Sequence, residues 1–132
     1  MKLIELLNAV LPLRTLSDAR FTSFKKSREL ALLRKKVEFE GEFYANEEKK
    51  IANLYAKKNE QGEPIILEGG RITLKDIESK KKFDEEISKL RNLEIEDIVR
   101  VELSEKDFAD SSKIPTPSEL LALESVIDFK EE

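Results

Sequence analysis

The sequence predicts a mainly α-helical α+β fold that forms a single domain over residues 1–132. The main observation is a stretch at residues 17–59 with no Pro, one Gly and many Leu, Ala, Glu, Lys and Arg residues. These residue types favour helix, so we expect one long amphipathic helix, or a helical hairpin bent at Gly41. Two short β-prone runs around Gly69 and Gly70 predict a small antiparallel sheet.

A short helix is expected at residues 2–11, where apolar residues recur at helical spacing. We expect Pro12 to end this helix, because a proline inside a helix lacks a backbone donor and clashes with the preceding turn. Ser17 is then the expected N-cap of the long helix, since its hydroxyl can accept a hydrogen bond from a free backbone amide.

The long helix carries an apolar stripe at three-four spacing, which indicates that one side of it is packed. Glu40 and Glu47 interrupt the stripe, so it does not fit a simple two-stranded coiled coil. A helix of this length needs a partner, either from the same chain or from another subunit, and we expect most of the stripe to pack internally. The candidate helix-interface residues are Leu30, Leu33, Val37, Tyr44, Ile51 and Leu54.

Residues 65–74 predict a β-hairpin that turns at the two glycines. A helix is expected at residues 75–92, with a capping box at Thr73 and with Ile77, Phe83, Ile87 and Leu90 on its buried face. In residues 95–103, apolar and charged residues alternate with the period of a half-buried strand. We expect this strand to be the third partner of the hairpin, because two strands alone are marginally stable.

Residues 104–116 are expected to be a linker that leads to a short C-terminal helix at residues 117–127. The start of that helix is marked by Thr116, Pro117 and Glu119. Threonine is a favoured cap, proline is favoured at the first helical position, and a glutamate three residues after the cap can bond back to it.

The composition gives no sign of an enzyme. The chain has no Cys and no His, which excludes disulfides, thiolate metal sites and the commonest general base. The carboxylates of the long helix fit a solvated face better than a catalytic pair. We therefore expect no catalytic residue, no cofactor and no metal ligand. The apolar N-terminal run is short and contains Glu5, so we expect no signal peptide or membrane segment and a cytoplasmic location.

The net charge of −4 is unevenly distributed. Residues 1–36 hold nine Lys or Arg against three Asp or Glu, which is a net charge of +6 and leaves −10 for the remainder. Such asymmetry indicates either a surface that binds a polyanion or a partner, or basic and acidic parts that lie against each other. Phe21 and Phe24 interleave with this cluster and are expected in the core. The candidate binding residues are Arg20, Lys25, Lys26, Arg28, Arg34, Lys35 and Lys36.

The order of these features resembles a family of short helical proteins from phages and prophages of Gram-positive hosts. The resemblance lies in six segments, and it supplies no catalytic residues. It implies a viral context, as a virion or assembly component or a small regulator of the host. The segments are residues 6–13, 17–21, 53–58, 59–65, 83–90 and 118–124.

Together these observations predict a non-enzymatic phage or prophage protein that acts through protein–protein contacts, as a virion assembly or structural accessory factor. Its partner would be another protein or a second copy of the chain, in the host cytoplasm or in the virion. The alternative is a small nucleic-acid-associated or host-defence-inhibiting protein that uses the basic segment 20–36. Nucleic acid is the less favoured partner, because the acidic remainder of the chain would repel phosphates and no named nucleic-acid motif is present.

Overall fold

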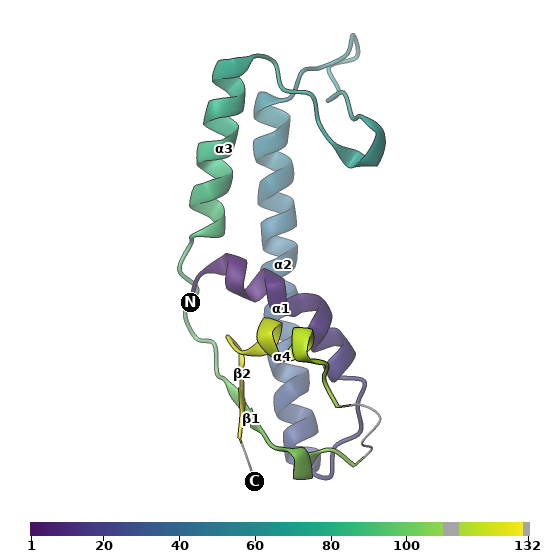
Figure 1. Ribbon diagram of the computed structural model, residues 1–132. Coiled ribbons are helices and arrows are strands. Elements are labelled where there is room, and N and C mark those ends of the chain that lie inside the picture. The colour runs from purple at the N-terminus through teal and green to yellow at the C-terminus, as the bar shows by residue number, and fades with distance from the viewer. Residues whose placement is uncertain (110–113, 131–132) are drawn as a thin grey trace. The chain divides into compact units, whose positions relative to one another are not determined.

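The computed structural model describes residues 1–109 and 114–130 (Figure 1). As predicted, the fold is mainly helical with a small sheet. The chain divides into two compact units, the first made of Met1–Gly41 and Glu94–Glu132 and the second of Glu42–Leu93. Each unit is described by itself. The longest helix, α2 (Phe24–Tyr55), contributes its first half to the first unit and its second half to the second unit.

Helix α1 (Leu3–Leu16) continues through Pro12, so the expected stop at this residue is wrong. An interior proline costs about 3 kcal/mol. The buried stripe of α1 repeats every three or four residues on both sides of Pro12, and burying each leucine contributes about 1.5–3 kcal/mol. Packing on the C-terminal side of Pro12 therefore outweighs its cost. Ser17 ends α1 and does not cap α2: its amide donates to the Leu13 carbonyl at 2.9 Å. The stripe consists of Leu3, Leu6, Ala9, Leu13 and Leu16.

Helix α2 is one continuous helix, but it is shorter at both ends than the expected span of 17–59. Ser23 supports its first turn, because the Ser23 hydroxyl accepts a hydrogen bond from the Lys25 amide at 3.2 Å. The helix passes through Gly41 without a bend into a hairpin. A Cβ atom at Gly41 would lie 3.6 Å from Val10 Cγ2, an ordinary contact distance, so the packing of α1 on α2 would admit an alanine at this position.

The C-terminal part of the first unit forms β1 (Val101–Leu103), α4 (Pro117–Leu123) and β2 (Ile127–Phe129). The two strands pair in parallel, with Val101 opposite Ile127. The expected antiparallel sheet, with residues 95–103 beside the hairpin, is therefore wrong. Parallel strands need a crossover connection, and α4 lies in it. The expected helix at residues 117–127 ends at Leu123 instead, and the chain beyond it extends so that Ile127 reaches the core from β2.

The start of α4 agrees with the prediction. The Thr116 hydroxyl accepts from the Glu119 amide at 3.3 Å, and the Glu119 carboxylate accepts from the Thr116 amide at 3.0 Å. Part of the expected linker 104–116 is structured: residues 105–107 form a short 3-10 turn, and Phe108 packs on Phe21 with ring centroids 5.1 Å apart. Residues 110–113 of that linker lie outside the described residues.

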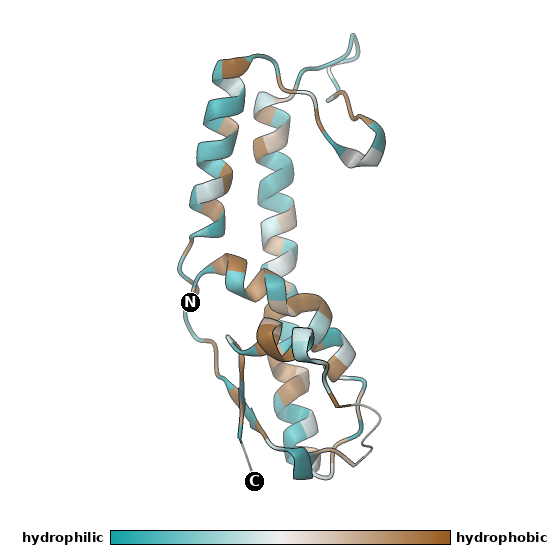
Figure 2. Ribbon diagram, viewed as in Figure 1, coloured by the Kyte–Doolittle hydropathy of each residue, from teal (hydrophilic) through white to brown (hydrophobic). Residues whose placement is uncertain are grey.

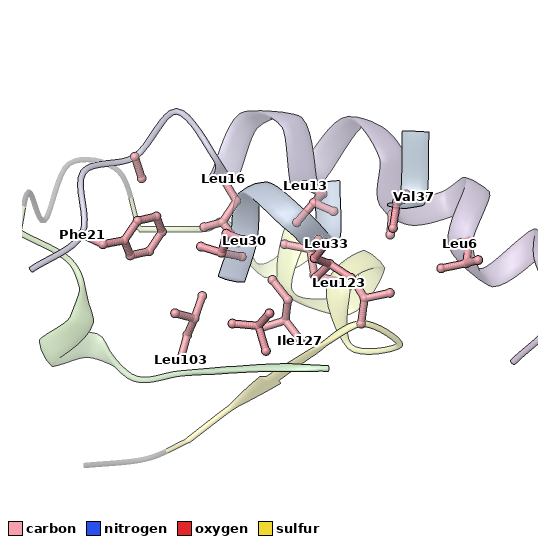
Figure 3. Close-up of a cluster of buried hydrophobic side chains, with 14 residues drawn as sticks. Leu6, Leu13, Leu16, Phe21, Leu30, Leu33, Val37, Leu103, Leu123 and Ile127 are labelled. Carbon is pink, nitrogen blue, oxygen red and sulfur yellow. The ribbon is translucent and has the colours of Figure 1, made fainter. Parts of the chain in front are cut away.

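One apolar core joins the elements of the first unit (Figure 3). Side chains from α1 and α2 meet those of β1, α4 and β2, and the labelled side chains in the close-up point toward one another. The core explains why the three short C-terminal elements form at all, since isolated elements of this length are unstable in water. Among its members are Leu6, Leu13, Leu16, Phe21, Leu30, Leu33, Val37, Leu103, Leu123 and Ile127.

In the second unit, α3 (Ile77–Arg91) lies beside the second half of α2 (Figure 1). Figure 2 shows that α3 is hydrophilic over most of its length. The Arg91 Nε atom donates a hydrogen bond to the Tyr44 hydroxyl at 3.2 Å. Ile87 is buried as predicted, but Ile77 is 89% exposed, which corrects its assignment to the buried face. The N-cap of α3 is Asp76, not Thr73, because the Asp76 carboxylate accepts a hydrogen bond from the Ser79 amide at 2.7 Å.

The hairpin between α2 and α3 is present, and Ile66 lies opposite Ile72 in an antiparallel bridge. Gly69 has a positive φ of 83°, as the turn requires. Three backbone segments are linked in a cycle of hydrogen bonds. The Lys57 amide donates to the Thr73 carbonyl, the Thr73 amide donates to the Ile65 carbonyl, and the Ile65 amide donates to the Lys57 carbonyl. The third partner of the hairpin is thus the chain that leaves α2. Each segment supplies hydrogen-bond partners for the backbone of the others, so the hairpin does not need the strand at residues 95–103 as a third partner.

Candidate functional site

Three of the seven basic candidates have partners within the first unit. Arg34 donates to the Ser17 hydroxyl at 2.8 Å and to the Glu38 carboxylate at 3.2 Å. Lys26 donates to the backbone carbonyl of Glu102 at 2.7 Å. Lys36 forms an ion pair with Glu40 at 3.0 Å. These three side chains therefore have partners within the unit. The interpretation that basic and acidic parts lie against each other applies to Arg34 and Lys36, which pair with glutamates one turn away in α2. For Lys26 the nearest partner is instead a neutral backbone carbonyl.

Glu38 is shared between two helices of the first unit. It accepts from Arg14 of α1 at 3.0 Å as well as from Arg34 of α2. Hydrogen bonds from the Arg14 side chain and then from the Arg34 side chain lower the pKa of the Glu38 carboxyl below its ordinary value. The charge network therefore belongs to the packing of α1 on α2, on the side of α2 near its buried stripe.

The other four basic candidates have no ion pair or hydrogen bond from their side chains within residues 1–109 and 114–130. All four side chains are exposed. Three of them lie near the start of α2, where the helix dipole is positive and where the first turn contains no acidic residue. Cations in this position weaken a helix, so helix stability does not explain them. The four residues are Arg20, Lys25, Arg28 and Lys35.

Three cations of α2 that are unpaired among the described residues, Lys25, Arg28 and Lys35, share one face of the helix with exposed apolar side chains. Lys25, Arg28, Leu32, Lys35 and Phe39 follow one another at steps of three and four residues, which places them on a single side of the helix. Phe24 stands at the start of this face. We call these six residues the outward face. It lies opposite the buried stripe of α2, because the two sets are offset by about half a turn.

The outward face exposes three large apolar side chains. Phe24 is 95% exposed, Phe39 64% and Leu32 51%. The Lys36 ammonium lies 5.9 Å from the centre of the Phe39 ring, at the edge of this face. A helix on the surface of a globular unit normally presents polar residues to water. Exposed apolar side chains that alternate with cations along one helix face form a candidate binding surface.

The predicted helix interface divides between the units. Leu30, Leu33 and Val37 are buried in the core of the first unit, so they are not available to a partner. In the second unit Tyr44 and Ile51 are half-buried, and Leu54 is 61% exposed. Phe24 is expected in the core but is 95% exposed, so the sequence prediction does not include the outward face. The signal that could have found it is the second three-four series that begins at Lys25.

Within the described ranges, no three Asp, Glu, His or Cys side chains converge to hold a metal ion. An open groove of about 660 Å³ lies beside the outward face, with Leu32 and Lys25 on one wall and Val99 on the other. The groove is open to solvent and is lined by side chains of both charges. The arrangement can bind a partner through apolar contact, with cations at the margin.

No family model, curated protein or solved structure matches the chain. The resemblance to phage and prophage proteins therefore stays a prediction, as does the function that it implies. Among the described helices, none combines the length and the apolar character that a membrane crossing requires.

Proposed function

We propose that this chain is a non-enzymatic phage or prophage protein that acts through protein–protein contacts, as a virion assembly or structural accessory factor. The observation that carries the proposal is the outward face of α2. Three large apolar side chains are exposed there beside Lys25, Arg28 and Lys35. Removing apolar surface from water contributes about 25 cal/mol per Å² to the free energy of binding. A protein partner that buries Phe24 and Phe39 would therefore obtain most of its binding free energy on this face from these two rings.

The viral context of the proposal rests on the sequence resemblance, and the binding role rests on the outward face. A partner with an apolar surface and acidic margins fits this face best, because it would pair the free cations while it covers the apolar residues. The protein would act in the host cytoplasm or in the virion.

A second candidate, nucleic-acid binding, is favoured by one observation: Arg20, Lys25, Arg28 and Lys35 lack carboxylate partners within the described residues. Exposed aromatic rings beside cations can also stack on bases. Against it, residues 37–132 carry a net charge of −10, which repels phosphates. Protein binding therefore remains the better supported function.

Site-specific photocrosslinking in a Gram-positive host separates the two candidates. A benzophenone amino acid replaces Leu32 on the outward face, and the matched control replaces Thr15, an exposed residue of α1. We expect discrete protein adducts from position 32 and none from position 15. Adducts that contain nucleic acid, or equal adducts from both positions, would contradict the proposal.

Charge reversal gives an independent measurement. In the variant with Lys25, Arg28 and Lys35 all changed to Glu, the protein adduct from position 32 should decrease but persist, because the apolar contact contributes most of the binding free energy and the cations lie at its margin. In the variant with Phe24 and Phe39 both changed to Ser, it should be lost. Binding to phosphates would behave in the opposite way and would weaken steeply as salt rises.

A further inference from the structure

The first unit carries both an exposed aromatic side chain and an apolar pocket of suitable chemistry. Phe24 projects from the start of α2 with 95% of its surface exposed. The pocket has a volume of about 590 Å³ and opens to solvent beside the end of β1. This volume lies within the range of about 300–1,000 Å³ that is common for pockets that bind small organic groups. The pocket is lined chiefly by Leu103, Phe108, Ile114, Leu120 and Phe129.

The aromatic floor of the pocket is fixed by the fold. Phe108 is held on one side by the ring of Phe21, at 5.1 Å between centroids. Phe129 belongs to β2, which is paired with β1. A phenyl group that enters the pocket would meet these rings and the side chain of Leu120. Aromatic pairs of this kind contribute beyond the area that they bury.

The charges at the rim match those beside Phe24. Lys25 and Arg28 follow Phe24 on the same helix face. Glu105 lines the pocket, its side chain is exposed, and it has no ion pair within the described residues. The other charged residue of the rim, Lys130, is already paired with Asp128 at 2.9 Å. Among the described residues, the pocket therefore presents one unpaired negative charge, that of Glu105, to an approaching aromatic residue that is followed by cations.

Phe24 and the pocket lie close together on the same unit. The Thr22 amide donates a hydrogen bond to the Asp107 carbonyl at 2.8 Å, and the backbones of Phe21 and Phe108 pair in an isolated antiparallel β-bridge. Phe24 is thus two residues from Thr22, whose backbone is hydrogen-bonded to Asp107, the neighbour of the pocket residue Phe108. In a two-fold dimer each subunit offers the same surface to the other. A two-fold axis beside this bridge would bring each Phe24 to the pocket of its partner.

We propose that the outward face contacts a second copy of this chain, with Phe24 of each copy inserted into the pocket formed by Leu103, Phe108, Leu120 and Phe129 of the other. This inference rests on the proposed function, because it names the partner of the same face. Two buried phenylalanines account for about 300–500 Å² of surface. A standard stable interface buries about 1,600 Å², so the dimer should be weak and should depend on protein concentration.

Sedimentation equilibrium of the full chain, from micromolar to about millimolar concentration, tests the proposal with three variants. Phe24→Ser removes the inserted ring, and Leu120→Glu places a charge in the pocket. Leu11→Ser is the matched control, since it removes an apolar side chain of α1 that is 68% exposed and lies outside the outward face. We expect the first two to weaken self-association by about tenfold or more, and the control by less than about twofold.

Mixing two defective variants gives the sharper result. Phe24→Ser keeps an intact pocket, and Leu120→Glu keeps the inserting ring. A mixture of the two should therefore associate more strongly than either variant alone, because one of the two contacts can form. If Leu120→Glu disturbs the circular dichroism spectrum, Ile114→Trp replaces it and fills the pocket from its rim.

The proposal is overturned if the chain stays monomeric over the whole range, if Phe24→Ser associates like the unmodified chain, or if the mixture gains nothing. A monomeric chain that still gives a discrete adduct with another protein from position 32 would refute the second copy as partner. In that case the proposed function stands. A monomeric chain without any protein adduct would refute both.

Discussion

The two halves of α2 differ in how they are packed, although one helix contains both. In the first half Leu30, Leu33 and Val37 are almost inaccessible to water. In the second half no residue of the helix is buried. The same contrast holds for the two units, because only Ala56 and Ile87 represent the second unit among the buried apolar residues. Helical residues of similar propensity therefore acquire very different amounts of stabilisation from their neighbours.

This difference indicates two levels of stability within one chain. Stability in proteins is not uniform, and segments with few buried apolar contacts open at lower free energy than the core. The first unit has a core to which five elements contribute. The second relies on half-buried side chains, the ring of backbone hydrogen bonds around Lys57 and the Arg91–Tyr44 hydrogen bond. We expect the second unit to open first.

The largest effect should come from the core of the first unit. Leu33 is 4% exposed, and Leu33→Ala should lower the free energy of unfolding by about 2–5 kcal/mol, because it leaves a cavity in a packed core. Its neighbour Leu32 is 51% exposed, so Leu32→Ala should cost less than about 1 kcal/mol. Urea denaturation followed by circular dichroism measures both. Equal losses would mean that the two faces of α2 are not packed differently.

A smaller and more local effect is expected in the second unit. Ile87 is 7% exposed, and Ile87→Ala should destabilise by about 1–3 kcal/mol. Hydrogen exchange should accelerate by about tenfold or more in α3 and in the second half of α2, with little change at amides of the first unit. Ile77→Ala is the control, because Ile77 is 89% exposed. Uniform acceleration throughout the chain would show that the two units open together.

Sequence reasoning found the elements whose signals are local. The spacing of Leu30, Leu33 and Val37 predicted the packed side of α2, and the cap at Thr116 predicted the start of α4. Both signals depend on residues within a few positions of each other, so tertiary structure did not need to be known.

The errors arose where distant residues decide the outcome. Pro12 remains inside α1 because burial of Leu13 and Leu16 in the core stabilises the helical turn that follows it. Residues 127–129 leave the helical pattern because β1 offers a strand to pair with. The outward face was not identified for a related reason: an apolar residue such as Phe24 has the same local signal whether the core covers it or not.

Loss of the N-cap of α4 should have a moderate effect on the first unit. Thr116→Ala removes the hydroxyl that accepts a hydrogen bond from the Glu119 amide, and it should lower the free energy of unfolding by about 1 kcal/mol. Thr116→Ser keeps an acceptor and should be close to neutral. Thermal unfolding of the variants, with amide exchange in α4, measures the effect. A loss as large as that of Leu33→Ala would mean that α4 is held by its cap more than by the burial of Leu123.

The smallest effect concerns the corresponding cap in the second unit, which carries a charge. The hydrogen bond from the Ser79 amide, followed by that from the Ser79 side chain, lowers the pKa of Asp76 below its ordinary value. A carboxylate with a depressed pKa stabilises the folded state above its unfolded pKa, and this contribution is lost as the pH falls through the folded pKa. The first turn of α3 should therefore loosen under acid conditions.

An NMR titration should show this loosening at the amides of Ser79 and Lys80, with the chemical shift of the Asp76 carboxyl carbon following the same transition. In Asp76→Asn the side chain still accepts a hydrogen bond but does not titrate, so the pH dependence at these amides should disappear. Amides near Leu33 should remain protected over the same range, because apolar burial in the first unit does not depend on this charge. If they lose protection together with Ser79, the two units do not differ in stability in the way that their packing indicates.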